Sequence, residues 1–128
     1  MSAITGVIAR PTSYVGIWGW MTTVDHKRIA VLYGVTAFIF FLVGGIEAGV
    51  IRMQLASADN ELITAGRFNQ MFTMHATTMV FMVIMPLSVS FFNFVVPLAI
   101  GARDVAFPRL NALSFWFFLF GALLMHMA

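Results

Sequence analysis

The chain has 128 residues, of which 61% are hydrophobic and 9% are charged, and it contains no cysteine. An ordinary soluble domain has about 25% charged residues, so this composition indicates a membrane protein whose spanning segments are helices. The lack of cysteine excludes iron–sulfur clusters, thiolate zinc sites and thioether-attached haem, and the net charge of +2 does not suggest a nucleic-acid partner.

The segment before the first apolar stretch carries an aromatic patch at Trp18 and Trp20. It has no compact apolar core followed by a small-residue cleavage site, so we do not expect a removed signal peptide. Aromatic side chains gather at membrane–water interfaces, and we expect this patch to lie at the headgroups. Asp25 and His26, in "TTVDHKRI", are predicted to cap and anchor the first spanning helix.

Three apolar spans predict an all-α transmembrane bundle that forms a single domain over residues 1–128. Ile29–Ile51 provides roughly 23 residues, or about 35 Å of helix, which is enough to cross a bilayer. Thr73–Ile100 contains Pro86 and Pro97, which predict a kinked helix with a broken last turn. The third span, at about 113–128, is too short to cross comfortably and suggests the N-terminal piece of a longer protein.

Basic residues predict the orientation of the bundle. Those before the first span and after the second are more numerous than those between the first two spans, which predicts a cytoplasmic N-terminus. The first group comprises Arg10, Lys27, Arg28, Arg103 and Arg109, and the second comprises Arg52 and Arg67, which Asp59 and Glu61 balance. Arg52 and His75 are therefore expected towards the outer surface, and Asp104 at the inner surface.

His75 stands in the apolar stretch "FNQMFTMHATTMVFMVIMP". An intramembrane imidazole needs a partner, and three readings remain open: a structural hydrogen bond, a haem or metal ligand, or a proton relay. At about 100° per residue, Pro86 and Asn93 return to nearly the same helix face. A six-coordinate haem would need a second axial ligand, and neither His26 nor His126 is well placed to provide it.

Arg52 and Glu47 are the ionisable residues near the outer end of the first span. Arg52 is either an anchor at the headgroups or a donor to a polar group of a bound cofactor. Glu47 lies deeper, and five residues is an awkward spacing for an ion pair with Arg52. It is expected to be either structural or associated with water.

Asp104, in "IGARDVAFPRLN", follows the second span, with Asn93 before it and Asn111 after it. Asp104 is either a solvated loop charge or an acid at the mouth of a proton pathway. Asn111 either caps the third helix or, together with Asn93, orders water for proton entry.

The stretches "TTVDHK", "IRMQLA", "FNQMFTMHATTM" and "NFVVPLAIGARDVAFPRLNALSFW" closely resemble, in order and spacing, the first part of subunit I of haem–copper terminal oxidases, cytochrome c oxidase especially. The resemblance covers about 22–116. It implies a twelve-helix subunit with a low-spin haem, a high-spin haem and a copper, which reduces O2 to water and pumps protons.

Matching positions carry specific roles into this sequence. His75 falls where the family has an axial ligand of the low-spin haem, and Arg52 where an arginine hydrogen-bonds the formyl group of haem A. Asp104 resembles the acid that opens a proton pathway, with Asn93 and Asn111 at its entrance amides. The ligands of the copper and the high-spin haem, and the second low-spin ligand, would lie beyond Ala128, so this stretch alone is not expected to be active.

Some positions depart from the family. Ala112 replaces an asparagine that often follows Asn111, which leaves its effect on pumping open. Gln54 stands where many relatives have an acid at a metal site near the outer surface, so we do not expect calcium or magnesium there.

The electron donor is predicted from a different set of positions. Related quinol oxidases bind ubiquinol through an Arg/Asp/His/Gln set, and the Arg and His positions are Val43 and Arg67 here, with Glu47 and Gln70 at the others. The arginine and histidine of this set are therefore missing, which favours cytochrome c as the electron donor. Two alternatives stay open: a quinol oxidase, and a stand-alone membrane protein with a structural or assembly role.

The resemblance also implies partners and a location. The partners would be the lipid bilayer, other oxidase subunits, cytochrome c and O2, with no nucleic acid. The expected location is a bacterial plasma membrane, which the chain crosses several times, rather than the mitochondrial inner membrane.

Overall fold

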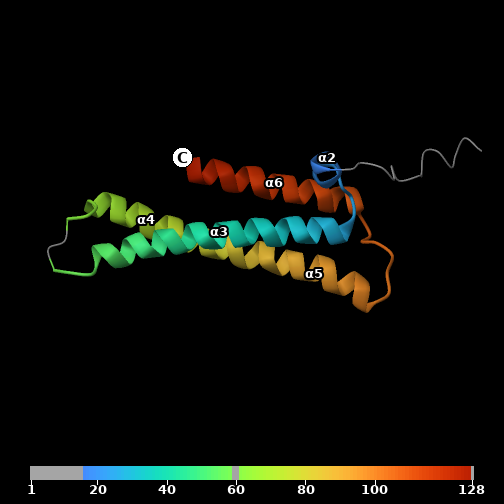
Figure 1. Ribbon diagram of the computed structural model, residues 1–128, viewed down its shortest axis with the longest axis horizontal. Helices are drawn as coiled ribbons and strands as arrows, with labels where there is room; N and C mark the ends of the chain where they lie inside the picture. Colours follow the sequence, from blue (N-terminus) through green and yellow to red (C-terminus); the bar gives the residue numbers. More distant parts are fainter. Residues whose placement is uncertain (1–15, 59–60, 128) are drawn as a thin grey trace, which may run out of the picture.

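The computed structural model describes residues 16–58 and 61–127, and this part of the chain is helical without β-strands. Its elements, in chain order, are α2 (Ile17–Met21), α3 (His26–Gln54), α4 (Ala65–Thr77), the π-helix η1 (Thr78–Ile84), α5 (Met85–Ala99) and α6 (Pro108–Met127). Because α4, η1 and α5 follow one another without a break, they form one long rod (Figure 1). This rod and α6 both pack against α3, which confirms the predicted all-α bundle.

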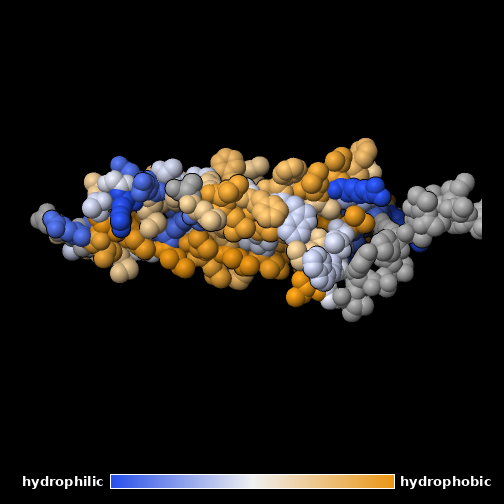
Figure 2. Space-filling model, turned by 90° about the horizontal axis from the view of Figure 1, so that it is seen from above, coloured by the Kyte–Doolittle hydropathy of each residue, from blue (hydrophilic) through white to orange (hydrophobic). Residues whose placement is uncertain are grey.

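Within the described residues, three stretches are long and apolar enough to cross a membrane: His26–Gln54, Ala65–Ala99 and Pro108–Met127. Figure 2 shows apolar side chains over the middle of the elongated molecule and polar ones towards both ends. Each helix begins before its predicted span because polar residues continue the helix where hydropathy falls. The expectation that the third span is too short was wrong, since α6 has 20 described residues.

Local signals fix the ends of several helices. Asp25 caps α3 as predicted, because its Oδ1 accepts a hydrogen bond from the backbone N–H of Lys27 at 3.0 Å. Thr64 caps α4 in the same way, with Oγ1 accepting from the Arg67 N–H at 3.4 Å. Gly101 follows α5 with a φ of +68°, a conformation that glycine adopts without strain and that ends the helix.

The short helix α2 precedes α3 and is rich in aromatic side chains. Trp18 is 71% exposed, and the Arg28 guanidinium of α3 lies over the Trp20 ring at 5.7 Å. The Arg28 Nη1 also donates to the Gly19 carbonyl at 3.4 Å, so α2 is held at the start of α3. Arg10 and Asp59, which entered the charge count, lie outside the described residues.

The irregularity that Pro86 predicted lies on its N-terminal side, as the π-helix η1. Proline has no N–H to offer the carbonyl four residues earlier, and its ring would clash with that carbonyl in a regular helix. A π-type hydrogen bond encloses one more residue than an α-type bond, so η1 widens the helix and turns the residues that follow it.

This turn changes which side chains share a face. A constant 100° per residue placed His75 and Asn93 on one face, but they contact different helices. His75 contacts Gly44 of α3, whereas Asn93 contacts Asn111 of α6. The expected common face counted α-helical steps across seven residues that form a π-helix, in which each turn holds more residues.

In the part of the chain that the structure describes, the core is thin and has two clusters of buried apolar side chains. One cluster comprises Phe40, Met82, Val83 and Ala122, and the other comprises Ile29, Tyr33 and Phe115. Most other large apolar side chains are exposed, including Phe38 at 61% and Phe117 at 70%. Such extensive apolar faces suit contact with lipid or with further membrane helices.

Candidate functional site

The half-buried His75 of α4 is fixed by a contact with the backbone of α3. Its Nδ1 lies 2.9 Å from the carbonyl oxygen of Gly44. A carbonyl oxygen only accepts, so Nδ1 carries the proton and Nε2 is the basic nitrogen of the neutral ring. Among the described residues, Nε2 has no hydrogen-bond partner.

Glycine at position 44 permits this contact. A Cβ there would meet the Met79 sulfur at 2.8 Å, and the Thr78 Cγ2 at 3.5 Å, so α3 and η1 approach closely. The close approach sets the ring of His75 beside a backbone carbonyl inside an apolar bundle.

The geometry of His75 fits a haem ligand. A neutral imidazole with Nδ1–H bound to a backbone carbonyl is the usual state of a metal-ligating histidine, because that hydrogen bond fixes the tautomer and orients the ring. No group of three or more metal-ligating side chains lies together within residues 16–58 and 61–127.

Arg52 lies in the last turn of α3, at the end of the bundle opposite His26. Its side chain is exposed, and within the described part of the chain its guanidinium has no hydrogen-bond or ion-pair partner. Its five N–H donors are therefore available to an acceptor such as a formyl oxygen. Glu47 does not pair with it, in keeping with the awkward spacing.

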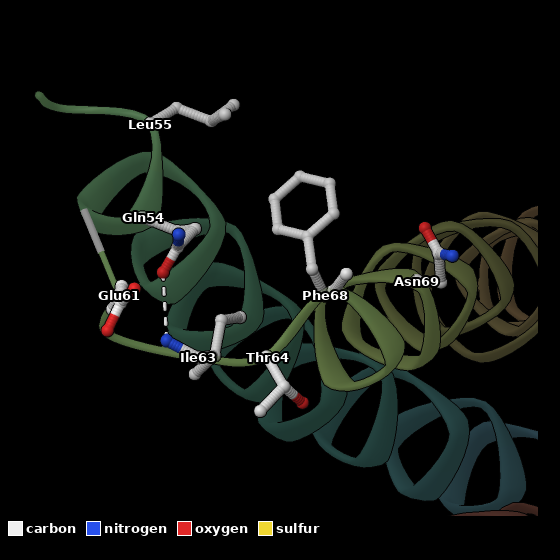
Figure 3. Close-up of a pocket in the computed structure, with 8 residues that line it drawn as sticks. Gln54, Leu55, Glu61, Ile63, Thr64, Phe68 and Asn69 are labelled. Carbon is white, nitrogen blue, oxygen red and sulfur yellow. Dashed lines mark hydrogen bonds between the residues drawn. The ribbon is translucent and has the colours of Figure 1, made fainter. Parts of the chain in front are cut away.

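At this end of the bundle, the side-chain amide of Gln54 holds the connector between α3 and α4 in place (Figure 3). The Gln54 Oε1 accepts a hydrogen bond from the backbone N–H of Ile63 at 2.8 Å, beside a cavity of about 650 Å³ that Glu61 and Phe68 also line. The neutral amide of Gln54 thus binds the backbone of the connector.

At the opposite end of the bundle, Asp104 contacts a buried histidine. The Asp104 Oδ1 lies 3.1 Å from Nδ1 of His26, which is only 2% exposed, and it also accepts from the Val105 N–H at 3.0 Å. Asp104 is therefore not a freely solvated loop charge. His26 was predicted to anchor the first spanning helix, and its side chain is buried against this carboxylate at the start of α3.

Asn93 and Asn111 form a second polar contact between α5 and α6. The Asn93 Nδ2 donates to the Asn111 Oδ1 at 3.0 Å. The Asn111 Nδ2 is buried and has no hydrogen-bond partner among the described residues. Asn111 is not the cap of α6, because the helix begins at Pro108 and the Asn111 backbone N–H already bonds to the Phe107 carbonyl at 3.1 Å.

The structure adds two residues that the sequence analysis missed. The Tyr33 hydroxyl lies 3.0 Å from the Ser114 Oγ, which donates to the Asn111 carbonyl at 2.8 Å. A tyrosine and a serine in apolar helices give no strong sequence signal. They become candidates because their hydroxyls continue the polar line from Asn93 and Asn111 between α3 and α6.

Glu47, which was expected to be structural or water-associated, is 8% exposed and pairs with α6. Its Oε1 lies 3.7 Å from the His126 Nε2, and that nitrogen lies 3.2 Å from the Thr78 hydroxyl. Since an isolated carboxylate is costly in a membrane interior, this contact explains how the bundle holds an acid at that depth.

Comparison with known proteins links these features to one family. A family model described as "Cytochrome C and Quinol oxidase polypeptide I" matches residues 28–128. The chain is 56% identical over 110 residues to cytochrome c oxidase subunit 1 of Bacillus sp. (strain PS3), an alignment that covers 86% of this chain and 18% of that protein. It is 54% identical over 112 residues to the subunit of the same name in Bacillus subtilis (strain 168), with 88% and 18% covered.

The family also includes a relative with a different donor in its name. The chain is 42% identical over 127 residues to quinol oxidase subunit 1 of Bacillus subtilis (strain 168), covering 98% of this chain and 20% of that protein. The chain thus spans only about a fifth of the length of the relatives it matches. Sequence match and helical architecture agree, and the chain belongs to the subunit I family of the haem–copper oxidases.

Proposed function

We propose that this chain is the N-terminal part of the catalytic subunit of a terminal respiratory oxidase. The complete subunit would pass electrons from cytochrome c through a low-spin haem to a haem–copper centre that reduces O2 to water, coupled to proton pumping. The observation that carries the proposal is the Nδ1 contact of His75 with the Gly44 carbonyl at 2.9 Å, which leaves Nε2 for iron.

In this proposal, His75 is one axial ligand of a low-spin haem A, and Arg52 donates to the formyl group. A six-coordinate haem supplies reversible one-electron transfer with little change in geometry. The chain's own part is to hold the imidazole in one tautomer and to present a cation at the same end of the bundle. The high-spin haem and copper belong to the complete subunit.

The proposed proton entry consists of the contact between Asp104 and His26, followed by a line of polar side chains between the helices. The Asp104 carboxylate takes up a proton at the surface, and the His26 imidazole at 3.1 Å holds it in place. Neutral amides and hydroxyls then provide donors and acceptors for water without adding charge, which suits proton movement through an apolar bundle. These residues are Asn93, Asn111, Tyr33 and Ser114.

The proposed orientation puts Asp104 on the cytoplasmic side of a bacterial plasma membrane and Arg52 on the outer side. It rests on the basic residues, which favour a cytoplasmic N-terminus. Asp104 and Arg52 lie at opposite ends of α3, as a subunit that takes protons from one side and electrons from the other requires. Lipid and the remaining oxidase subunits would cover the exposed apolar faces.

A quinol oxidase is the second candidate, and one observation favours it. A cavity of about 510 Å³ between α4 and α6 is lined by Gln70 and His126, and His126 contacts Glu47. The cavity offers an amide and an imidazole to a quinol. Position 43, however, is valine and has no guanidinium to match the arginine expected in quinol oxidases. We therefore prefer cytochrome c.

Steady-state oxygen consumption by the purified complete oxidase separates the two donors. We expect turnover with reduced cytochrome c and none with ubiquinol. An artificial reductant that feeds the same preparation is the control for an active enzyme. Turnover with ubiquinol and none with cytochrome c would contradict the proposed donor and select the second candidate.

A further inference from the structure

The Glu47–His126 contact has a hydrogen-bond pattern that suits more than a structural role. The His126 Nδ1 lies 3.0 Å from the Ala122 carbonyl, which only accepts, so this nitrogen always carries a proton. Any proton that the ring gains or loses therefore sits on Nε2, which faces the Glu47 Oε1 at 3.7 Å and the Thr78 hydroxyl at 3.2 Å.

The Thr78 hydroxyl suits both states of that nitrogen. It donates to Nε2 when the imidazole is neutral and accepts from Nε2–H when the imidazole is charged. Thr78 is fully buried, at 0% exposure, so water does not compete for this contact. The Glu47 Oε2 is also buried and has no hydrogen-bond partner among the described residues, which leaves an oxygen that can carry a proton.

The surroundings of the pair contain few other charges. The ionisable side chains nearest in sequence on the packed elements are Arg52 on α3 and Arg67 and His75 on α4, while η1 and α5 have none. The other ionisable side chains of α3 and α6 lie in the first turns of those helices, at the His26 end of the bundle: His26, Lys27, Arg28, Tyr33 and Arg109. A low-dielectric setting strongly favours a net charge of zero, so Glu47 and His126 hold one exchangeable proton between them.

A cavity beside His126 extends along α4. His126 lines the cavity of about 510 Å³, whose other polar side chains are Asn69, Gln70 and Thr73 of α4. Asn69 also lines the larger cavity at the α3–α4 connector. The polar lining therefore runs from the partly exposed imidazole of His126 to Asn69, beside the α3–α4 connector.

We propose that Glu47 and His126 are a proton-binding pair that exchanges a proton with the aqueous phase at the Arg52 end, through this cavity. In the exchange, a proton on Glu47 passes to Nε2 of His126, the Nε2–H bond then breaks, and the proton passes to water in the cavity that His126 lines; uptake is the reverse. This inference goes beyond the proposed function, since it uses neither the haem nor the electron donor.

Infrared difference spectroscopy of the complete oxidase in nanodiscs tests the pair directly. The readout is the C=O stretch of a protonated carboxylic acid, followed as pH changes and as H2O is replaced by D2O, without turnover. We expect a wild-type band that responds to pH and exchanges with D2O. It should be absent in Glu47→Gln, shifted in His126→Gln, and unchanged in Glu61→Gln, which removes an exposed carboxyl at the same end.

Further variants test the route of the proton through the cavity and keep the proposal testable if Glu47→Gln does not fold. Gln70→Leu, at the cavity wall, should slow deuterium exchange of the band several-fold without changing its amplitude at equilibrium. If Glu47→Gln fails to assemble, Glu47→Asp keeps the carboxyl and should move the band. A Glu47 band that neither responds to pH nor exchanges over hours would overturn the proposal, as would a band that changes only when a quinol is added. Because the pair does not depend on the haem, the same infrared result is expected even if a His75 variant loses its haem.

Discussion

Two histidines of the bundle, His75 and His126, hold Nδ1 against a backbone carbonyl, at 2.9 and 3.0 Å. The same bond fixes the same tautomer in both rings and leaves Nε2 for chemistry. Their surroundings differ: Nε2 of His126 faces Glu47 and Thr78, whereas Nε2 of His75 has no partner among the described residues. At this scale, the neighbours of Nε2 distinguish the proposed proton carrier from the proposed iron ligand.

Arg52 provides a prediction at the residue scale. Replacing it by methionine removes the proposed hydrogen bond to the haem formyl and should shift the low-spin absorption band of the complete oxidase. Arg67→Met is the matched control, because it removes another exposed arginine at the same end of the bundle. A band that stays in place in Arg52→Met, or moves equally in both variants, would count against the contact.

Asp104 provides a second prediction. Asp104→Asn keeps the shape of the side chain but cannot take up a proton, so proton-coupled turnover should fall by a factor on the order of 10², as expected for the loss of a proton-transfer group. Asp25→Asn is the control at the same end, because asparagine is an equally good helix cap. Wild-type turnover with full pumping in Asp104→Asn would exclude it as the entry group.

The sequence indicated single candidate residues better than it indicated the contacts between them. His75 and Asp104 stand out because polar residues beside apolar runs are conspicuous. Their partners do not, since the chain joins His26 to Asp104 across 78 positions and Tyr33 to Ser114 across 81. Separations of this size carry no periodic signal, and only helix packing brings such residues together.

At the scale of elements, hydropathy predicted the three spanning helices but not their ends or their register. The predicted second span began at Thr73, whereas the helix begins at Ala65, because Arg67, Asn69 and Gln70 lower the hydropathy of its first turns. Pro86 predicted an irregularity, but not that a π-helix would form before it. Register after that point depends on how many residues each turn contains, which the apolar pattern does not reveal.

The close approach of α3 and η1 gives a prediction for two adjacent glycines. Gly44→Ala should lower thermal stability, because the new Cβ would lie 2.8 Å from the Met79 sulfur and push the helices apart. Gly45→Ala is the control, since nothing lies within 4 Å of its Cβ. Overpacking costs roughly 1–3 kcal/mol, and alanine is otherwise the better helix former, so the two variants should differ in sign.

Thermal unfolding of the complete oxidase in detergent measures this difference. The Gly44 variant should also disturb the low-spin haem band, because the Gly44 carbonyl holds the His75 ring. Equal stability of the two variants would mean that the contact between α3 and η1 is looser than the structure indicates.

At the scale of the whole molecule, the described helices place two groups of candidate site residues at opposite ends of one bundle. His26 and Asp104 lie at one end, while Arg52 lies at the other end of the same helix, α3. The thin core and exposed apolar faces match a chain that spans about a fifth of its relatives. Its helices would complete their packing, and its candidate site would gain its remaining ligands, within the full subunit.

The most direct test of the account is the optical spectrum of the complete oxidase with His75 replaced by alanine, recorded beside the His126→Gln variant. Because the Nε2 of His75 is the proposed iron ligand, the low-spin haem spectrum should be lost in the first variant and kept in the second. Added imidazole should restore part of it if the subunit remains folded. A normal low-spin spectrum in His75→Ala would contradict the account.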